Sequence, residues 1–524
     1  MGTYLNPGND GFKRILKGNY IDKTGMIEII NNRIESSDVL ICISRPRRFG
    51  KSYAAQMLCA YYDHTCKSES LFDDKEISNS DSYKDHCNQY NVIYLDMSNL
   101  LGKVKPELLI SFIEENVTEE LLSEYPSLKK GSTFDQTLIN TVELGKPKFI
   151  MIIDEWDAPI RETPQITKEY LLFLRMLFKS SGTTSKIFAA AYMTGILPIK
   201  KDGSESAISD FREFTILQPG PFAKYTGFTE TEVKGLCEQY SMSFEQAKQW
   251  YDGYDFKRSE PIYNPYSVMM AMQMEEYRSY WRKTSTAESL KTYVGMNMDD
   301  LQNKILRLIA GEPVEVYTDD FENDFETFNS SDDVLTLMIH LGYLVYDSET
   351  SQAHIPNEEL RIEFKRLLNR PTNKRLSELV CDSEKLLQDT LNGNEAEVVN
   401  AIVRVRNTNY APMFYNNEQA LRYVIKFAYI VCIDYYLKVE ELPTGQGIAD
   451  VVFLPKRDTS LPAMIVELKW NKTAEGAIRQ IKEKNYPSLI SEYTGDILLV
   501  GINYDEDTKK HSCKIEKIKI IDIC

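Results

Sequence analysis

Two groups of residues in this chain have the types and spacing that phosphate chemistry requires. The first is Gly50-Lys51-Ser52, followed later by the apolar run Ile152-Ile153 and the pair Asp154-Glu155. The second is Asp450 with Glu467-Leu468-Lys469. A phosphate loop with a metal carboxylate serves nucleotide hydrolysis, and two carboxylates beside a lysine serve metal-dependent phosphodiester hydrolysis. Together the two groups predict an ATPase joined to a nuclease.

The residues around Lys51 fit the strand, loop and helix of a P-loop. Residues 39–43 form a short apolar run typical of a buried parallel strand, and residues 52–62 are compatible with a helix. In this context Lys51 neutralises the β and γ phosphates of ATP, and the Ser52 hydroxyl holds Mg²⁺. Arg45 stands where the GxxxxGK[ST] pattern has its first glycine, so a solvated basic loop is the alternative interpretation.

Two further strands are expected to end in polar residues of the same site. Residues 149–153 are fully apolar, and after them we expect Asp154 to bind Mg²⁺ and Glu155 to polarise the attacking water. An acidic turn is the alternative there. Residues 186–193 end at Thr194, whose hydroxyl is expected to sense the γ phosphate at the carboxyl edge of the sheet.

The surrounding segments predict the rest of an N-terminal domain. Residues 92–96 are one more candidate strand, and residues 107–122 and 167–178 are amphipathic. Residues 1–235 are therefore predicted to form a parallel α/β ATPase domain.

The second group of residues falls on two expected strands, 447–454 and 463–469, which follow an apolar helix over 420–437. Side chains two apart in a strand share a face, so Glu467 and Lys469 project together and Asp450 meets them from the partner strand. The two carboxylates and the Leu468 carbonyl are expected to hold Mg²⁺ or Mn²⁺, and Lys469 to position water or stabilise charge. A surface hairpin is the alternative.

A helix over 473–484 and a strand over 497–501 complete the expected C-terminal α/β core. The basic side chains of Arg479, Lys482 and Lys484 on that helix would either contact backbone phosphates or form a solvated charged face.

The chain resembles the AAA-ATPase-like proteins with a C-terminal PD-(D/E)XK nuclease domain, which occur mainly in bacteria and some archaea. The resemblance covers nearly the whole chain. It rests on the following segments: Tyr20-Ile21-Asp22-Lys23-Thr24, residues 44–52, residues 153–159, residues 194–198, Gly227-Phe228-Thr229, residues 250–254, Ile262-Tyr263-Asn264-Pro265, residues 355–359 and the C-terminal motif.

The resemblance implies an AAA-like P-loop domain, a helical middle region and a restriction-endonuclease-like C-terminal domain. Relatives share the arginine-rich loop, which brings Arg45, Arg48 and Phe49 into the predicted nucleotide site. It also implies that Gln480 lies beside the nuclease metal and that Glu418 is an additional upstream acid. AAA-type sites often borrow an arginine from a neighbouring subunit, so a homo-oligomer is considered, with these candidate donors: Arg45, Arg47, Arg48 and Arg212.

The middle of the chain, residues 236–370, is expected to be mainly helical. A helix over 333–341 and a pairing of 343–346 with 354–356 resemble a winged-helix unit. The acidic approach at residues 330–333 favours a structural lid or relay over DNA contact. Residues 250–254 are expected to pack at a helix end, with Asp252 near the nucleotide as the alternative. Residues 371–524 are assigned to the nuclease-like domain.

Composition limits the class of protein. The chain of 524 residues is 43% hydrophobic with a net charge of −17, which suits several globular domains and argues against a general affinity for nucleic acid. Residues 440–524 are nearly balanced, with 12 Lys and Arg against 14 Asp and Glu, so DNA is best tolerated there. Nine cysteines without a CxxC pair and no long apolar run predict a cytoplasmic protein without a membrane partner.

These observations lead to one functional hypothesis and one alternative. ATP binding or hydrolysis is expected to control a Mg²⁺-dependent nuclease that acts on nucleic acid, with DNA as the expected substrate. By analogy, its role would be in defence or the control of mobile elements. The alternative is a nucleotide-gated signalling switch whose nuclease-like domain binds nucleic acid or a partner without cutting it.

Overall fold

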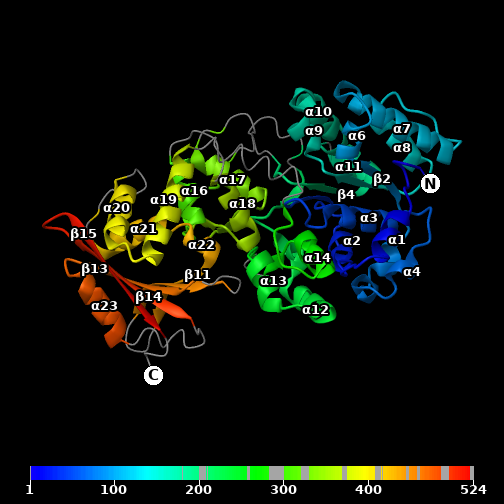
Figure 1. Ribbon diagram of the computed structural model, residues 1–524. Helices are drawn as coiled ribbons and strands as arrows, with labels where there is room; N and C mark the ends of the chain where they lie inside the picture. Colours follow the sequence, from blue (N-terminus) through cyan, green and yellow to red (C-terminus); the bar gives the residue numbers. More distant parts are fainter. Residues whose placement is uncertain are drawn as a thin grey trace. The chain divides into compact units, whose positions relative to one another are not determined.

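The computed structural model describes residues 2–179, 181–199, 208, 210–255, 260–281, 300–319, 321, 328, 330–368, 374–407, 415, 417–443, 448–456, 461–484 and 495–519. They divide into two compact units (Figure 1). The first unit contains residues 1–290 and 314–362, and the second contains residues 291–313 and 363–524. None of the helices in these ranges is long and apolar enough to cross a bilayer.

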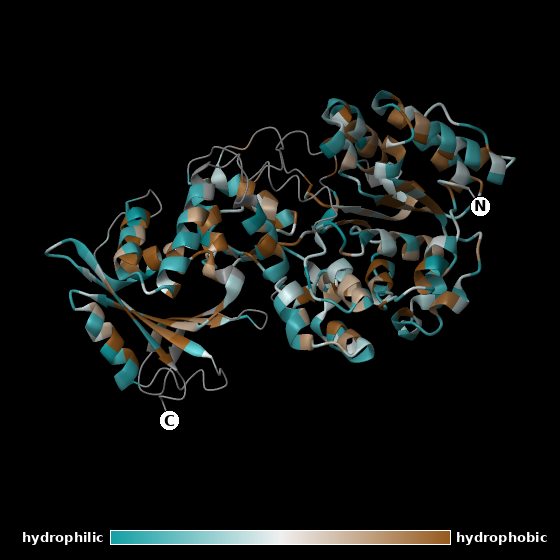
Figure 2. Ribbon diagram, in the orientation of Figure 1, coloured by the Kyte–Doolittle hydropathy of each residue, from teal (hydrophilic) through white to brown (hydrophobic). Residues whose placement is uncertain are grey.

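A parallel five-stranded sheet is the centre of the first unit. Its order is β2-β3-β4-β1-β5, formed by β1 (Leu40–Ser44), β2 (Asn91–Asp96), β3 (Phe149–Asp154), β4 (Phe188–Gly195) and β5 (Arg212–Phe214). Strands β1, β3 and β4 are buried along their whole length because helices cover both faces of the sheet. Figure 2 shows hydrophobic residues concentrated in these strands.

The helices of this domain are α1 (Asp10–Leu16), α2 (Gly25–Asn31), α3 (Lys51–Tyr62), α4 (Glu69–Phe72), α5 (Tyr83–His86), α6 (Met97–Leu101), α7 (Leu109–Glu124), α8 (Phe134–Glu143), α9 (Ala158–Glu162), α10 (Thr167–Phe178) and α11 (Ser181–Ile187), with 3-10 turns η1 (Glu76–Asn79), η2 (Pro106–Leu108), η3 (Pro164–Ile166) and η4 (Gly220–Tyr225). Helices α1, α2 and α3 pack on one face of the sheet, and α7, α8 and α10 pack on the other.

Smaller elements complete the first unit. They are the ribbon β6 (Phe228–Thr229) with β7 (Ile262–Tyr263), the helices α12 (Glu230–Tyr240), α13 (Phe244–Tyr251) and α14 (Pro265–Met274), and a second group with β8 (Val314–Glu315), α17 (Ser331–His340), β9 (Val345–Asp347) and β10 (Gln352–His354). The antiparallel order β8-β10-β9 beside α17 is winged-helix-like, and β8 is a strand that the sequence did not predict. The chain passes into the second unit within α18 (Glu358–Leu368).

The second unit is built on a mixed five-stranded sheet of order β11-β12-β13-β14-β15, in which only the β13–β14 pair is parallel among the described pairings. Its elements are α16 (Leu301–Ile309), α19 (Lys374–Leu391), α20 (Glu395–Arg406), α21 (Glu418–Ala428), α22 (Cys432–Tyr435), β11 (Tyr436–Pro443), β12 (Ile448–Pro455), β13 (Ala463–Trp470), α23 (Ala474–Glu483), β14 (Asp496–Asp505) and β15 (Lys510–Lys519). Helix α23 crosses between the parallel strands and buries Ile478 and Ile481 against the sheet.

Several predicted elements are wrong in extent. The pairing expected between 343–346 and 354–356 joins Val345–Asp347 to Gln352–His354, and the strand expected over 497–501 runs over Asp496–Asp505. The helix expected over 420–437 ends at Ala428, and after the short α22 the chain enters β11, whose residue Leu437 pairs with Leu454. The strand expected over 186–193 begins at Phe188, since Lys186 and Ile187 belong to α11. Gly447, the first residue of one expected strand, lies outside the described residues. The three-domain division at 1–235, 236–370 and 371–524 stays a prediction.

Candidate nucleotide and nuclease sites

The loop between β1 and α3 turns sharply at its end to begin the helix. Gly50 precedes Lys51 with φ of 84°, in the left-handed region that favours glycine. Arg48 also has a positive φ, of 71°. The loop therefore changes direction at two residues between Ser44 and the first turn of α3. The backbone N–H groups at the start of the helix are then available to bind an anion.

The Lys51 side chain lies inside this loop. Its ammonium donates to the carbonyl oxygens of Arg45 (3.0 Å) and Pro46 (2.9 Å), and only 6% of the residue is exposed. Burial lowers the pKa of Lys51 to about 8, while nearby carboxylates, first Asp154, oppose this shift. A charged group held with so little solvent is well placed to bind an anion.

Asp154 ends β3 and joins three elements. Its Oδ1 accepts a hydrogen bond from the Thr194 hydroxyl at the end of β4 (2.6 Å), and its carboxylate also receives the Ser52 hydroxyl from α3. Burial raises the pKa of Asp154, and these two hydrogen bonds oppose the rise. A carboxylate and a hydroxyl in contact are oxygen ligands of the kind that Mg²⁺ prefers, so Ser52 and Asp154 fit a magnesium ion. The Thr194 hydroxyl, which was expected to sense the γ phosphate, is thus hydrogen-bonded to Asp154, and its predicted role stays a prediction.

Glu155 is held by residues that sequence analysis missed. Its Oε2 accepts a hydrogen bond from the Ser98 hydroxyl (2.5 Å) and lies 3.8 Å from Nη2 of Arg161. Arg161 also donates through Nε to Asp157 (2.9 Å), which accepts the backbone N–H groups of residues 196 and 197. Arg161 is four residues after Asp157 on one helix, a spacing that was the available signal for this pair.

The loop arginines differ in surroundings. Arg45 is fully buried and donates to the Thr226 hydroxyl (2.9 Å) and the Phe214 carbonyl (2.8 Å). Arg48 lies over the ring of Tyr266, 3.7 Å from its centre, and its Nη1 is buried without a hydrogen-bond partner among the described residues. That orphaned nitrogen of Arg48 fits an anion. The Arg45 guanidinium donates to protein groups, and its place in the nucleotide site stays a prediction.

A cavity of about 1110 Å³ opens beside these residues. The P-loop from Arg47 to Ser52 and the pair Asp154-Glu155 line one part of it. The apolar side chains that also line it are Ile21, Met57, Phe228, Met269 and Met270. A cavity of this size with a charged part and an apolar part suits a ligand that combines phosphates with a flat organic ring. Arg212 is not among its lining residues and pairs with Asp38 (3.1 Å).

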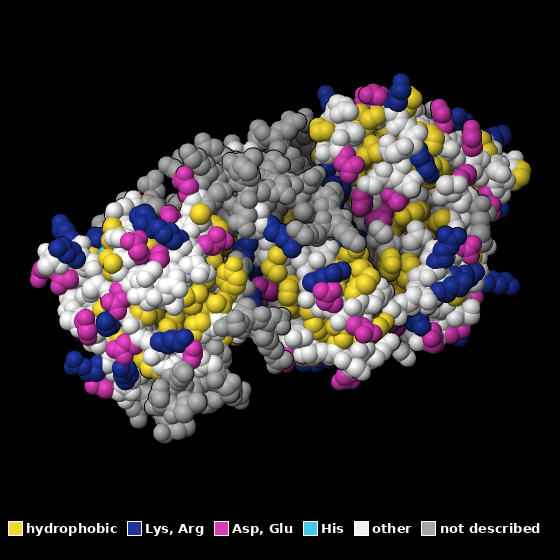
Figure 3. Space-filling model, viewed as in Figure 1, with side chains coloured by type: hydrophobic (Ala, Val, Ile, Leu, Met, Phe, Trp, Pro, Cys, Tyr) yellow, Lys and Arg dark blue, Asp and Glu magenta, His cyan; other side chains and the backbone are white. Residues whose placement is uncertain are grey.

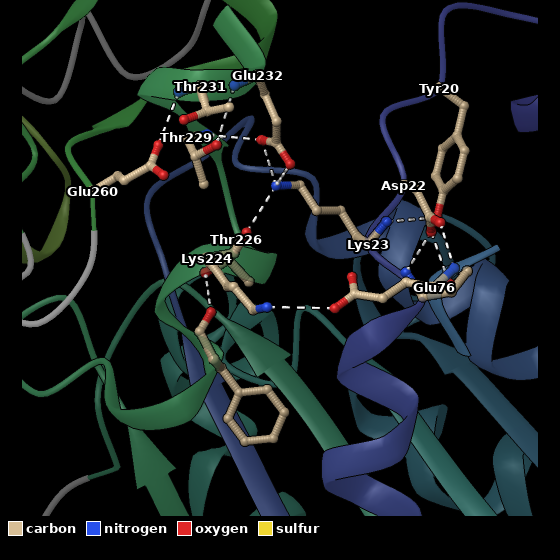
Figure 4. A network of polar contacts seen from close by, with 12 residues as sticks. Tyr20, Asp22, Lys23, Glu76, Lys224, Thr226, Thr229, Thr231, Glu232 and Glu260 are labelled. Carbon is tan, nitrogen blue, oxygen red and sulfur yellow. Dashed lines mark hydrogen bonds and ion pairs between the residues drawn. The ribbon is translucent and has the colours of Figure 1, made fainter. Parts of the chain in front are cut away.

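The Tyr20-Thr24 segment connects the cavity wall to α12 (Figure 4). Lys23 donates to both carboxylate oxygens of Glu232 (2.7 and 2.6 Å) and to the Lys224 carbonyl (2.7 Å). Glu232 also closes a capping box with Thr229 at the start of α12. The same carboxylate therefore caps a helix and compensates a partly buried cation that lines the cavity.

Tyr254 connects the P-loop to the winged-helix-like group. Its ring meets Phe49 edge-on at 5.1 Å, and its hydroxyl donates to the Gly342 carbonyl (2.6 Å). Gly342 has φ of 80°, and a Cβ there would lie 2.7 Å from Pro46, so glycine is required by conformation and by space. Asp252 is not among the cavity-lining residues.

The strands β12 and β13 assemble the second site. Antiparallel pairing of Val451 with Val466 places Asp450 beside the end of β13, where its Oδ2 accepts the Leu468 N–H (2.8 Å). Glu467 Oε1 accepts Lys469 Nζ (2.8 Å) and the side-chain amide of Gln480 from α23. Asp450, Glu467, Lys469 and Gln480 thus come together, as their positions in the sequence predict; their catalytic roles stay predictions.

Glu467 is a buried carboxylate with an oxygen available to a cation. It is 2% exposed, and burial raises its pKa to about 7 despite the hydrogen bond from Lys469. Its Oε2 is buried with no hydrogen-bond partner in the described part of the chain. The described residues contain no group of three His, Cys, Asp or Glu side chains placed to hold a metal. A divalent ion would therefore rely on Asp450, Glu467 and the Leu468 carbonyl, which are oxygen donors that suit Mg²⁺ or Mn²⁺.

Helix α21 borders this site. Arg422 forms an ion pair with Asp450 Oδ1, a contact that no sequence pattern predicts. Glu418 is the first residue of α21, one turn before Arg422, and its part in the site stays a prediction. On α23, Lys482 pairs with Glu516 of β15. On the face drawn in Figure 3, cationic and anionic side chains of the described residues are interspersed over both units.

Known proteins match the two parts separately. Residues 7–204 match a family model described as predicted AAA-ATPase, and residues 416–513 match the PD-(D/E)XK nuclease superfamily. A curated relative is the uncharacterized protein in the vnfD 5′ region of Azotobacter chroococcum mcd 1, which is 24% identical over 532 residues that cover 96% of each chain.

Among solved structures, the chain is similar to the ORC2 protein of Aeropyrum pernix, with 13% identity, 70% of this chain and 98% of that chain covered, and a TM-score of 0.32. It is also similar to Cdc6p from Pyrobaculum aerophilum, with 12% identity, coverage of 68% and 94%, and a TM-score of 0.27.

Proposed function

Since residues 7–204 belong to the predicted AAA-ATPase family and residues 416–513 to the PD-(D/E)XK nuclease superfamily, we propose that the chain hydrolyses ATP and uses it to control a Mg²⁺-dependent nuclease. The observation that supports this proposal most is that the predicted site residues lie together in the folded chain. Lys51 and Ser52 at the start of α3 meet Asp154 at the end of β3 in the lining of one cavity, and Asp450 on β12 lies beside Glu467 on β13. DNA is the proposed substrate.

In the first site, Lys51 and Arg48 bind and neutralise the phosphates of ATP, and Ser52 and Asp154 hold Mg²⁺. Glu155 lies one residue beyond Asp154 and accepts a proton from the attacking water. Its contact with Ser98 orients this carboxylate. The apolar part of the cavity takes the base.

In the second site, Asp450 and Glu467 hold the divalent ion, which when bound lowers the pKa of water and polarises the phosphate. Lys469 orients the water and stabilises charge that develops on the phosphate. Gln480 fixes the rotamer of Glu467 through the shared oxygen Oε1. Burial raises the pKa of Glu467 to about 7, so near neutral pH a cation would compete with a proton for this carboxylate.

The proposed coupling between the nucleotide site and the second unit passes through Tyr254. A change in the P-loop on ATP binding reaches Phe49, then the Tyr254 ring and the Gly342 carbonyl. Residues 253 and 356 are in close contact, and α18 starts two residues later and carries the chain into the second unit. A role in defence against mobile DNA is a prediction from the resemblance.

The nuclease proposal is tested with purified full-length protein, supercoiled plasmid and single-stranded DNA, in Mg²⁺ or Mn²⁺. Cleavage by the wild type and its loss in Asp450→Asn, which keeps the side-chain shape, is the expected result. Equal cleavage by both proteins would identify a contaminant and refute the assignment. Measurable ATP turnover without cleavage of either substrate would favour the nucleotide-gated switch.

A further inference from the structure

Arg422 places a positive charge where a nuclease of this kind needs its metal. It projects from α21 and pairs with Asp450, and the side chains are 20% and 8% exposed, respectively. Two carboxylates withdrawn from water require compensating charge when no divalent ion is bound. Lys469 supplies it for Glu467, and Arg422 supplies it for Asp450.

The hydrogen bonds of the individual carboxylate oxygens show which of these atoms an incoming cation could bind. Asp450 Oδ2 is held by the Leu468 N–H, and Glu467 Oε1 is held by Lys469 and Gln480. The oxygens left to receive an incoming cation are Glu467 Oε2, which has no hydrogen-bond partner among the described residues, and Asp450 Oδ1. Arg422 binds the second of these two atoms.

We propose that Arg422 competes with the divalent cation for Asp450 Oδ1 and thereby sets the metal concentration at which the site is loaded. The inference rests on the proposed nuclease function. A guanidinium keeps its charge at any physiological pH, so only a cation of higher charge density displaces it. The displaced side chain leaves Asp450 without a change in the protonation of either group.

A matched control lies one turn further along α21. Lys426 is four residues after Arg422, and its side chain is 16% exposed and pairs with Glu312 at 3.4 Å. Lys426→Gln therefore removes the same charge from a similar ion pair on the same helix. Arg422→Lys keeps the charge with a different geometry, so it separates electrostatic competition from simple packing.

The experiment is calorimetric titration of Mn²⁺ into nucleotide-free, full-length protein. Arg422→Gln should bind Mn²⁺ at least about tenfold tighter than the wild type, since removing a unit charge at contact distance is a large effect even in a polar environment. Lys426→Gln and Arg422→Lys should stay within about threefold of the wild type. Unchanged or weaker binding by Arg422→Gln would overturn the proposal and leave Arg422 as a support for Asp450.

Two further measurements keep the outcomes distinct. If Arg422→Gln unfolds too readily for titration, saturating Mn²⁺ should raise its melting temperature by more than it raises that of the wild type, and an equal or smaller rise counts against the proposal. Asp450→Asn tests the site itself. If it binds Mn²⁺ as the wild type does, the proposed nuclease site is wrong whatever Arg422 does.

Discussion

At the scale of single residues, Lys51 makes the nucleotide site sensitive to pH. Its pKa in the folded protein is about 8, below its ordinary 10.5, so in the nucleotide-free site Lys51 loses its positive charge as the pH rises through 8. ATP binds the protonated form. Affinity for ATP should therefore be level below pH 8 and fall by up to about tenfold for each pH unit above it.

Fluorescence titration with a labelled ATP analogue between pH 6.5 and 9.5 measures this effect. Lys51→Ala should bind weakly, with a flat profile over the same range. An equally steep decline in Lys51→Ala would show that another group titrates and would remove Lys51 from the explanation.

The residues that meet at each site were foreseeable where local rules apply. Carboxyl ends of parallel strands share one edge, which brings Asp154 to the P-loop, and alternation along a strand puts Glu467 beside Lys469. The spacing of Asp157 and Arg161 was a local signal that the sequence analysis did not use, whereas the Arg422 contact follows from no such rule. The Arg422 contact depends on how α21 packs on the sheet, which pairs residues 28 positions apart.

At the scale of elements, Tyr254 makes two contacts that substitutions can separate. Its ring packs against Phe49 of the P-loop, and its hydroxyl donates to the Gly342 carbonyl. Tyr254→Phe should keep the contact with Phe49 but leave the Gly342 carbonyl without its donor, at a cost of about 1 kcal/mol in unfolding free energy. Tyr254→Ala should remove both contacts and cost about 3 to 5 kcal/mol. Thermal unfolding ranks the two variants.

ATP affinity gives the functional side of the same comparison. It should weaken in Tyr254→Ala, because Phe49 loses its support, and stay close to the wild type in Tyr254→Phe. If the two variants bind ATP equally well, the ring contact does not maintain the P-loop.

The stability that the Lys23–Glu232 ion pair contributes can be measured separately from the capping role of Glu232. Glu232→Gln keeps a capping residue at the same position of α12 but leaves Lys23 without its carboxylate, and we expect a loss of about 2 to 4 kcal/mol. Glu230→Gln is the matched control. Glu230 lies on the same helix and pairs with the half-exposed Lys234 and Lys248, so its loss should cost under about 1 kcal/mol.

Thermal melting of the two Gln variants decides this prediction. A loss in Glu232→Gln no larger than in Glu230→Gln would mean that the partly buried pair contributes no more than an ordinary surface pair.

Sequence patterns predicted elements well where helix or strand period was unambiguous. Helix α10 occupies Thr167–Phe178 as the amphipathic pattern indicates. Strand β11 was missed because Leu437, Glu440 and Glu441 are good helix formers, and only pairing with β12 gives the segment its strand conformation. The extended pairing outweighs a weak local preference.

At the scale of the whole molecule, the family matches and the fold support two chemical parts in one chain, while the net charge of −17 limits where a nucleic acid can bind. Element type was foreseeable around the P-loop and for the two C-terminal strands, whereas the strand order came only from the structure. The division into two compact units was not, because one unit contains residues 314–362 after an interruption that belongs to the other. Contacts distant in sequence determine such a division.

The measurement that tests the central claim most directly is the rate of plasmid cleavage in Mg²⁺ with and without ATP, for the wild type, Lys51→Ala and Asp450→Asn. We predict that ATP changes the wild-type rate, that Lys51→Ala cleaves at one rate whether or not ATP is present, and that Asp450→Asn does not cleave. Asp450-dependent cleavage with the same ATP response in Lys51→Ala as in the wild type would contradict the coupling of the two sites.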